Sequence, residues 1–291
     1  MGPLHVTEHS DAAALLSHAA FLLERREHGE IENGVMLGVC AAASRAAPAS
    51  DALWLTIDDD LGPVAAAMRT PPYHLLVSRM AHDARRALID ALRARGSAIP
   101  GVTSIAETAH AFGAEWAAEN DVRASVTMRQ GVYALTRVTP LARAPRGRMR
   151  PAEEREAIIL EQWAKAIAID AARPIAERDM FSRLVRSHVR ARTLSIWELD
   201  GAPVSMACVQ GATKNGIRVS MVYTPPEHRG HGFASACVAA VSERELASGR
   251  RFCMLYADLA NPTSNGIYRR IGYQMIGESV MVAFSPRSVA V

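Results

Sequence analysis

A short glycine-rich loop carries the residues of this chain that are best suited to bind an anion. The sequence Glu227-His228-Arg229-Gly230-His231-Gly232 stands between a strand-like stretch and a run with helical spacing. The first N–H groups of a helix have no partner within it, and the helix dipole adds partial positive charge there. Glycines at 230 and 232 can adopt positive φ and let a bulky diphosphate approach the main chain. The loop therefore predicts an anion site to which Arg229 adds formal charge.

The elements on either side must position this loop. Apolar residues alternate over 216–223, and Pro225-Pro226 ends the strand because proline cannot continue a central ladder. Apolar residues then recur at helical spacing over 234–241, and Gly249 lies where a helix C-cap belongs. A plain turn before a helix is the alternative, since the loop has neither the Lys-Ser/Thr of a P-loop nor dinucleotide-binding spacing.

A second segment downstream favours a binding site over a plain turn. A buried strand over 252–257 leads to a short helix that begins after Asn261-Pro262 and ends at Gly272. Tyr268 lies inside this helix, and a final strand pair is predicted near 273–284.

Together the two segments resemble the GNAT superfamily of N-acetyltransferases. The acetyl-CoA loop of that family reads Q/R-x-x-G-x-G/A, and Arg229, Gly232 and Ala234 match its three positions. A second family signature is an Asn seven residues before a Tyr that is followed by Gly and an aromatic residue. It is matched by Asn261, Tyr268, Gly272 and Tyr273. The resemblance covers roughly residues 145–291.

The resemblance implies acetyl-CoA as the cosubstrate and no metal. The loop N–H groups would hold the pyrophosphate, and the end of the preceding strand would pair with the pantetheine arm and direct a backbone N–H at the thioester carbonyl. Asn261 would touch the pantetheine or only cap its helix. The expected cofactor-binding residues are Met221, Val222, Tyr223, Arg229, Gly230, His231, Gly232, Phe233, Ala234, Ser235, Asn261, Ser264 and Tyr268.

Tyr268 matches the family tyrosine near the CoA sulfur, where a phenol can protonate the departing thiolate as general acid. The general base stays open, because residues 216–223 contain no carboxylate where many family members have a glutamate. The candidates are Glu227, His228, Asp258, Glu198 or a chain of water molecules.

The resemblance thus implies transfer of an acetyl group to a primary amine by direct attack in a ternary complex, without a covalent enzyme intermediate. A small-molecule acceptor is expected, since no extended peptide groove can be read from the sequence. Two alternatives stay open: an acetyltransferase for a protein amine, and a non-catalytic acyl-CoA-binding sensor or regulatory protein. The missing strand carboxylate favours the sensor, whereas Tyr268 favours the enzyme.

Length and composition set the remaining expectations. A chain of 291 residues exceeds one compact core, so two α/β (α+β) domains are expected. The 33 basic and 30 acidic residues form no block, so nucleic acid is not expected as a partner. Four cysteines without CxxC spacing, and no run of about 18 apolar residues, indicate a cytoplasmic protein that does not enter a membrane. The oligomeric state is not predicted.

The proline- and arginine-rich segment 139–151 marks the expected boundary. It separates a smaller N-terminal α/β domain, 1–140, from a catalytic GNAT domain, 146–291, with a mixed, mostly antiparallel central sheet.

The N-terminal domain is expected to be either a degenerate GNAT-like copy or an unrelated α/β domain. The spacing D-x-x-P-V-x-x-A occurs at both 60–67 and 200–207, and Thr70-Pro71-Pro72 resembles Thr224-Pro225-Pro226. Hairpins favour Asp, Gly and Pro, which accounts for part of this similarity. With no glycine loop, the N-terminal domain is expected to bind no CoA and to wall one side of the acceptor pocket.

The sequence His5-Val6-Thr7-Glu8-His9 matches the H-x-x-E-H of a metalloprotease class. That chemistry needs both histidines on one rigid helix, and this copy lies in a terminal segment. No zinc site is expected there.

Overall fold

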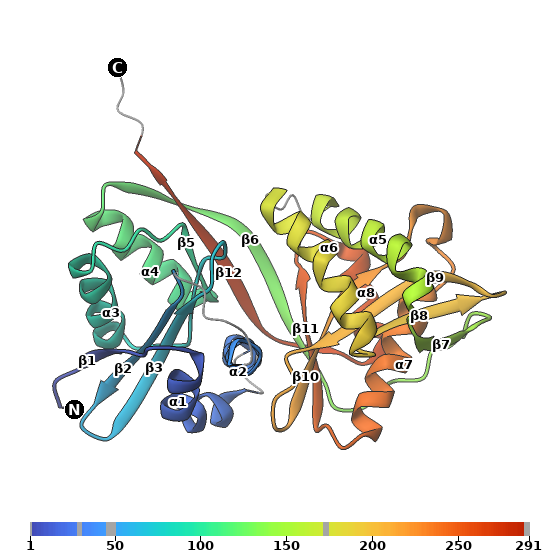
Figure 1. Ribbon diagram of the computed structural model, residues 1–291, viewed down its shortest axis with the longest axis horizontal. Coiled ribbons are helices and arrows are strands. Elements are labelled where there is room, and N and C mark those ends of the chain that lie inside the picture. The colour runs from blue at the N-terminus through green and yellow to red at the C-terminus, as the bar shows by residue number, and fades with distance from the viewer. Residues whose placement is uncertain (1, 28–30, 45–50, 171–174, 288–291) are drawn as a thin grey trace. The chain divides into compact units, whose positions relative to one another are not determined.

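The computed structural model describes residues 2–27, 31–44, 51–170 and 175–287, which form two compact units (Figure 1). Unit 1 comprises Met1–Val132, Asp258–Ala260 and Met275–Val291, and unit 2 comprises Tyr133–Ala257 and Asn261–Gln274. Among the described residues, no helix has both the length and the apolar composition needed to cross a membrane.

The same order of elements occurs twice along the chain. The first repeat runs β1 (His5–Glu8), α1 (Ala12–Arg26), α2 (Ile31–Ala43), β2 (Leu53–Asp59), β3 (Gly62–Arg69), β4 (Leu75–Val77), α3 (His82–Ala94), β5 (Gly101–Ile105), α4 (Ala106–Glu119) and β6 (Val122–Leu135). The second runs β7 (Arg148–Pro151), α5 (Ala157–Asp170), α6 (Ile175–Arg190), β8 (Leu194–Leu199), β9 (Ala202–Gln210), β10 (Gly216–Tyr223), α7 (Phe233–Ala247), β11 (Phe252–Asp258), α8 (Pro262–Ile271) and β12 (Gln274–Pro286). Short 3₁₀ turns precede α5 and α7.

Strand pairing also repeats. In each repeat the first four strands pair antiparallel in chain order, and the fourth pairs parallel with the fifth. The strand order is β1-β2-β3-β4-β5-β12-β6 in unit 1 and continues from β6 as β11-β10-β9-β8-β7 in unit 2. The mixed, mostly antiparallel sheet expected from the sequence is confirmed.

The last strands of the two repeats are exchanged. In unit 1, β12 pairs with β5 from Ser279↔Ile105 to Ala283↔Gly101, and in unit 2 the end of β6 is the neighbour of β11. The structure therefore differs from the expected division at residue 146, because the strand that begins at Gln274 joins unit 1 at Met275. This pairing joins distant residues, so no local sequence pattern reveals it.

The internal similarity read from the sequence has a structural basis in the hairpins. The β2–β3 hairpin shifts register between Ile57 and Asp58, and the β8–β9 hairpin shifts at the matching place, between Trp197 and Glu198. The Thr-Pro-Pro similarity does not correspond, because one copy follows β3 and the other follows β10. The tandem arrangement is thus real, although part of the sequence evidence for it is coincidental.

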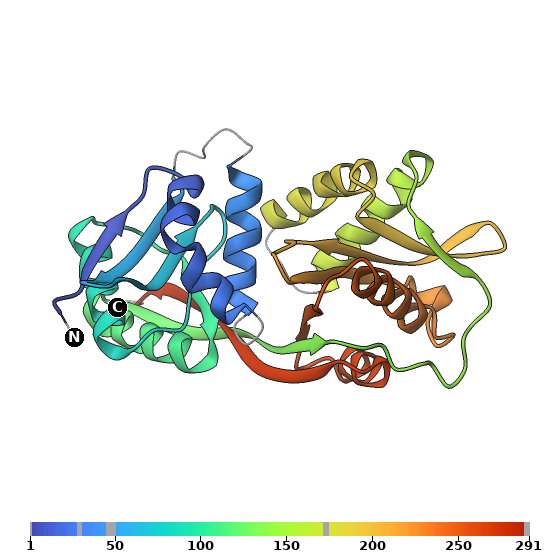
Figure 2. The same cartoon turned by 90° about the horizontal axis from the view of Figure 1, so that it is seen from below.

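Each unit has helices on both faces of its strands. In unit 2, Trp163 of α5 and Met221 of β10 belong to one buried cluster, whereas α7 and α8 cover a second cluster that includes Tyr133 and Tyr268. In unit 1, α1 and α2 cover one face, and α3 and α4 cover the other (Figure 2). The end of β10 thus has a different helical layer on each face.

An acidic residue, buried in the first repeat and partly buried in the second, occupies the same place in both hairpins. Asp58 pairs with Pro63 of β3, and Glu198 pairs with Pro203 of β9. His18 Nε2 lies 2.6 Å from one oxygen of Asp58, and Thr56 Oγ1 donates to the other at 2.7 Å. Burial raises the pKa of the Asp58 carboxyl, but hydrogen bonds from His18, Thr56 and Thr7 together outweigh burial and lower it. The ionised form is therefore part of the folded state.

We predict that Asp58→Asn lowers the free energy of unfolding by about 1–3 kcal/mol at neutral pH, because buried donors lose a charged acceptor. A folded pKa below the ordinary 3.8 means that this contribution is present above pH 3.8 and is lost as the pH falls through the folded value. Urea unfolding across this range would measure it, with exposed Asp60→Asn as the control. An equal loss in both variants, or a loss that grows in acid, would contradict the assignment.

Candidate functional site

Strand β10 carries a bulge near its C-terminal end. Ser220 pairs with Cys208 and Tyr223 pairs with Met206, so Met221 and Val222 together face the single residue Ala207 of β9. Met221 has φ +50°, which is rare for a residue with a side chain. The bulge turns the main chain out of the regular ladder at the residues that sequence analysis assigned to the pantetheine arm.

Beside the bulge, β10 parts from β11. Their parallel register runs from Gly216↔Phe252 to Arg218↔Met254 and ends there, although both strands continue. The main chain beyond Arg218 therefore has no register with β11 in the described structure. An opening between two parallel strands leaves polar backbone groups that an extended ligand can satisfy.

The glycine loop follows the bulged strand and ends at the start of α7. Gly230 and Gly232 have φ +82° and +83°, and Gly232 is the N-cap residue of the helix. No side chain of the described residues caps this end. A Cβ built on either glycine meets nothing within 4 Å, so the space over the loop is open. The first N–H groups of α7, from Phe233, Ala234 and Ser235, border an accessible surface.

The Arg229 side chain turns back toward the end of β10. Its Nε donates to the carbonyl oxygen of Thr224 at 3.0 Å, and its guanidinium carbon lies 5.7 Å from the centre of the Tyr223 ring. Its Nη2 lies 3.7 Å from Asp170 Oδ2 at the end of α5. Nearby, the His231 ring lies 5.7 Å from the Phe233 ring. Arg229 thus connects the strand end with α5.

The second segment forms α8 as expected. Asn261 is the N-cap, and its Oδ1 accepts a hydrogen bond from the Ser264 N–H at 3.0 Å. Gly272 ends the helix in the left-handed region at φ +108°. The side-chain oxygen of Asn261 therefore serves as a cap, which was one of its two expected roles.

Tyr268 lies on the buried face of α8. Its ring centre is 6.3 Å from that of Tyr133 and 6.0 Å from that of Tyr273. Burial raises the pKa of Tyr268 to about 12, so its phenol is protonated at neutral pH. Sequence analysis identified Tyr268 but not Tyr133, which comes from the first repeat and has no signature of its own.

The candidates for a general base differ in their surroundings. Glu198 accepts hydrogen bonds from Arg148 and Arg150, and the bond from Arg150 holds the pKa of its carboxyl below the ordinary value. A carboxylate committed to two guanidinium groups is a poor proton acceptor. Asp258 is exposed and belongs to unit 1, and Glu227 is exposed in the turn after β10. None of the three lies on β10, the strand before the glycine loop, which is where a glutamate base was looked for.

The first repeat lacks the corresponding features. Only residues 78–81 join β4 to α3, and none is a glycine. Ser104 Oγ of β5 donates to the Val77 carbonyl oxygen at 2.8 Å, which bridges the strands where β10 and β11 have parted. Phe112 is the seventh residue of α4, as Tyr268 is of α8, and has no hydroxyl.

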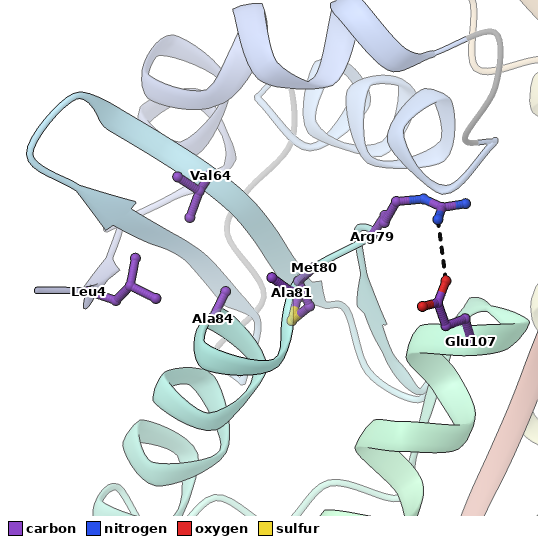
Figure 3. Close-up of a pocket in the computed structure, with 7 residues that line it drawn as sticks. All are labelled: Leu4, Val64, Arg79, Met80, Ala81, Ala84 and Glu107. Carbon is purple, nitrogen blue, oxygen red and sulfur yellow. Dashed lines mark hydrogen bonds and ion pairs between the residues drawn. The ribbon is translucent and has the colours of Figure 1, made fainter. Parts of the chain in front are cut away.

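A pocket in unit 1 lies at the start of α3, the counterpart of α7 (Figure 3). Its polar side chains, Arg79 and Glu107, pair with each other at 3.4 Å. The rest of the lining comes from Leu4, Val64, Met80, Ala81 and Ala84. The lining of this pocket is mostly apolar, and its Arg79 already pairs with Glu107. The pocket therefore differs from the open glycine loop of the second repeat.

The H-x-x-E-H segment lies on a strand rather than a helix, because His5–Glu8 form β1 and pair with β2. Within the described part of the chain, no group of three or more His, Cys, Asp or Glu side chains is arranged to hold a metal ion.

The segment that contains the candidate site matches a known protein family. The family of FR47-like proteins matches residues 203–282, which run from β9 through the glycine loop and α8 into β12. No curated protein matches the chain significantly.

Several solved structures match nearly the whole chain. A GCN5-related N-acetyltransferase from Sphaerobacter thermophilus is 14% identical with a TM-score of 0.62, over 100% of this chain and 99% of that one. A GNAT-family acetyltransferase from Colwellia psychrerythraea is 12% identical with a TM-score of 0.59, over 97% and 99%. A tandem GNAT protein from the clavulanic acid biosynthesis pathway is 12% identical with a TM-score of 0.57, over 97% and 98%. The resemblance read from two short segments thus extends to the fold of the whole chain, which is that of the GNAT acetyltransferases and includes the first repeat.

Proposed function

We propose that this chain is an acetyl-CoA-dependent N-acetyltransferase with its active site in unit 2. The observation that carries the proposal is the parting of β10 from β11 beside a bulge, directly before an uncapped helix N-terminus with two left-handed glycines. These features supply, in chain order, groups for the acyl end, the pantetheine arm and the diphosphate of one extended ligand. The fold alone does not specify an activity, so the proposal rests on this site.

The second repeat offers a separate group for each part of acetyl-CoA. The N–H groups around Gly230, His231, Gly232 and the first turn of α7 would hold the diphosphate. The main chain of Met221–Tyr223 would pair with the pantetheine amides and stabilise the oxyanion through a backbone N–H. Arg229 would act mainly by fixing the strand end, because its side chain already bonds Thr224.

The reaction would be direct attack of a neutral primary amine on the thioester carbonyl. The C–N bond forms, the oxyanion collapses, and the C–S bond breaks with release of the thiolate. The extra proton that attack leaves on the nitrogen passes to that thiolate, directly or through water, which gives the amide and the free thiol. A pKa of about 12 makes Tyr268 a weaker acid than a thiol, whose ordinary pKa is about 8.5. Tyr268 would therefore donate a hydrogen bond to the thiolate. Full transfer of its proton would be favoured only where burial in the site also raises the pKa of the CoA thiol.

A small-molecule amine is the acceptor in this proposal. Strand β10 carries no carboxylate, and Glu198 is held by arginines, so the ammonium proton would leave through water molecules, the exposed Glu227 or the partly buried His228. The same lack of a strand carboxylate favours the second candidate function, an acyl-CoA sensor without catalysis. The first repeat, with Phe112 and no glycine loop, would carry no transfer site.

We expect acetyl-CoA to stabilise the protein against thermal unfolding. At about a hundred times the Kd, mass action predicts roughly 2.7 kcal/mol, or a midpoint shift of several degrees. Inorganic pyrophosphate alone should give a much smaller shift, because it reaches only the loop. No shift at saturating acetyl-CoA would rule out both the enzyme and the sensor.

The loop is tested by Gly232→Val, with Gly277→Val as the control. Both glycines have open space around a built Cβ, but only Gly232 has positive φ. Gly232→Val should lower basal stability by about 1–2 kcal/mol through backbone strain. It should also reduce the shift caused by acetyl-CoA, because the side chain enters the space over the loop, whereas Gly277→Val should keep the full shift. Equal shifts in both variants would show that the diphosphate lies elsewhere.

Tyr268→Phe tests the role of the phenol, and thiol release by the wild type separates the enzyme from the sensor. In an assay of thiol release with a panel of amines, we expect kcat to fall by about a hundredfold while the Kd of acetyl-CoA changes little. A folded pKa of about 12 also predicts that wild-type kcat loses nothing through ionisation of Tyr268 near pH 10, where an ordinary tyrosine is half ionised. Unchanged turnover in the variant would remove Tyr268 from the mechanism.

A further inference from the structure

We propose that Tyr133, which the first repeat contributes, is a positioning residue for Tyr268 in the active site of unit 2. The inference rests on the proposed function, because it concerns the placement of the phenol that acts there. Tyr133 lies near the end of β6 and is fully buried within the core of unit 2. Its hydroxyl donates a hydrogen bond of 2.7 Å to Oδ1 of Asn265 in α8.

The amide of Asn265 is fixed at both ends. Its Oδ1 accepts from Tyr133, and its Nδ2 donates to the carbonyl oxygen of Asn261 at 2.7 Å. Asn261 in turn caps the helix through the Ser264 N–H. Tyr133 therefore anchors the first turn of α8 and its N-cap to β6, since a buried amide with both ends engaged has one favoured orientation.

The anchored turn leads directly to Tyr268. Asn265 and Tyr268 are three residues apart on α8 and therefore lie on the same face of the helix. The rings of Tyr133 and Tyr268 are also in contact range, with centres 6.3 Å apart. A shift of Asn265 would thus move the phenol, and a displacement of about 1 Å in a reacting group can cost about a hundredfold in rate.

The first repeat does not contain the corresponding arrangement. Ala109 stands at the fourth position of α4, where α8 has Asn265, and Phe112 stands where α8 has Tyr268. Neither side chain has a polar atom, so the phenol is missing, and so is a hydrogen bond from the last strand of the unit, which is β12 in unit 1. The polar link therefore accompanies the candidate catalytic helix and is not a general requirement of this fold.

The experiment compares Tyr133→Phe with Tyr273→Phe. Each change removes one buried hydroxyl beside Tyr268: Tyr273 bonds Ser242 at 2.8 Å, and its ring centre is 6.0 Å from that of Tyr268. Both variants should lower the urea midpoint to a similar degree. We expect Tyr133→Phe to lower kcat about tenfold or more, with a smaller change in the KM for acetyl-CoA, while Tyr273→Phe stays within about twofold of wild type.

A second variant tests the same link from its other side. Asn265→Ala should reduce kcat as Tyr133→Phe does, and the double variant should be no slower than the slower single variant, because both changes break one chain of contacts. If Tyr133→Phe does not fold, Asn265→Ala is judged by the same comparison with Tyr273→Phe.

The outcomes distinguish this inference from the proposed function. An active wild type whose kcat falls equally in Tyr133→Phe and Tyr273→Phe would overturn the positioning role alone. Additive losses in the double variant would overturn it as well. A wild type that binds acetyl-CoA but releases no thiol with any amine would overturn the proposed function and this inference together.

Discussion

The separation of β10 from β11 is the constraint on which the site in unit 2 depends. A regular parallel pair would use the backbone groups of both strands, but here the register ends at Arg218↔Met254. Met221 holds φ +50°, a conformation that costs a residue with a side chain about 1–2 kcal/mol. The pairing of β9 on one side and the buried contacts of Met221 beneath α5 stabilise this bulge. The backbone groups of β10 beyond Arg218 are thus left open to a ligand, and the strain lies at Met221. Strained residues of this kind are common at functional sites.

The first repeat shows that the fold can exist without the open site. Its β4 and β5 also lose their register, after Leu76↔Thr103, but the Ser104 side chain bridges them there. Its β4–α3 connection has four residues, and Phe112 takes the place of Tyr268. Burial of apolar surface requires only the layers of helix and sheet, which both repeats keep. The glycine loop, the bulge at Met221 and the phenol of Tyr268 have no counterparts in the first repeat, so the features of the candidate site are separable from the fold.

Sequence analysis succeeded where the information is local. Gly232 and Gly272 adopt positive φ, and Asn261 caps α8, because these roles depend on a few neighbouring residues. The analysis could not foresee the positive φ of Met221, which is a side-chain-bearing residue in an alternating strand and is held by its neighbours. Nor could it place Tyr133 beside Asn265, since 132 positions separate them along the chain.

The exchange of last strands accounts for both the missed domain division and the missed residue. The core of unit 1 includes Val280 and Val282 from the second repeat, and that of unit 2 includes Tyr133 and Leu135 from the first. Without the exchanged strand, β5 and β11 would each be left with an open edge and uncovered apolar residues. Neither repeat completes its own core, because the last strand of each unit comes from the other repeat.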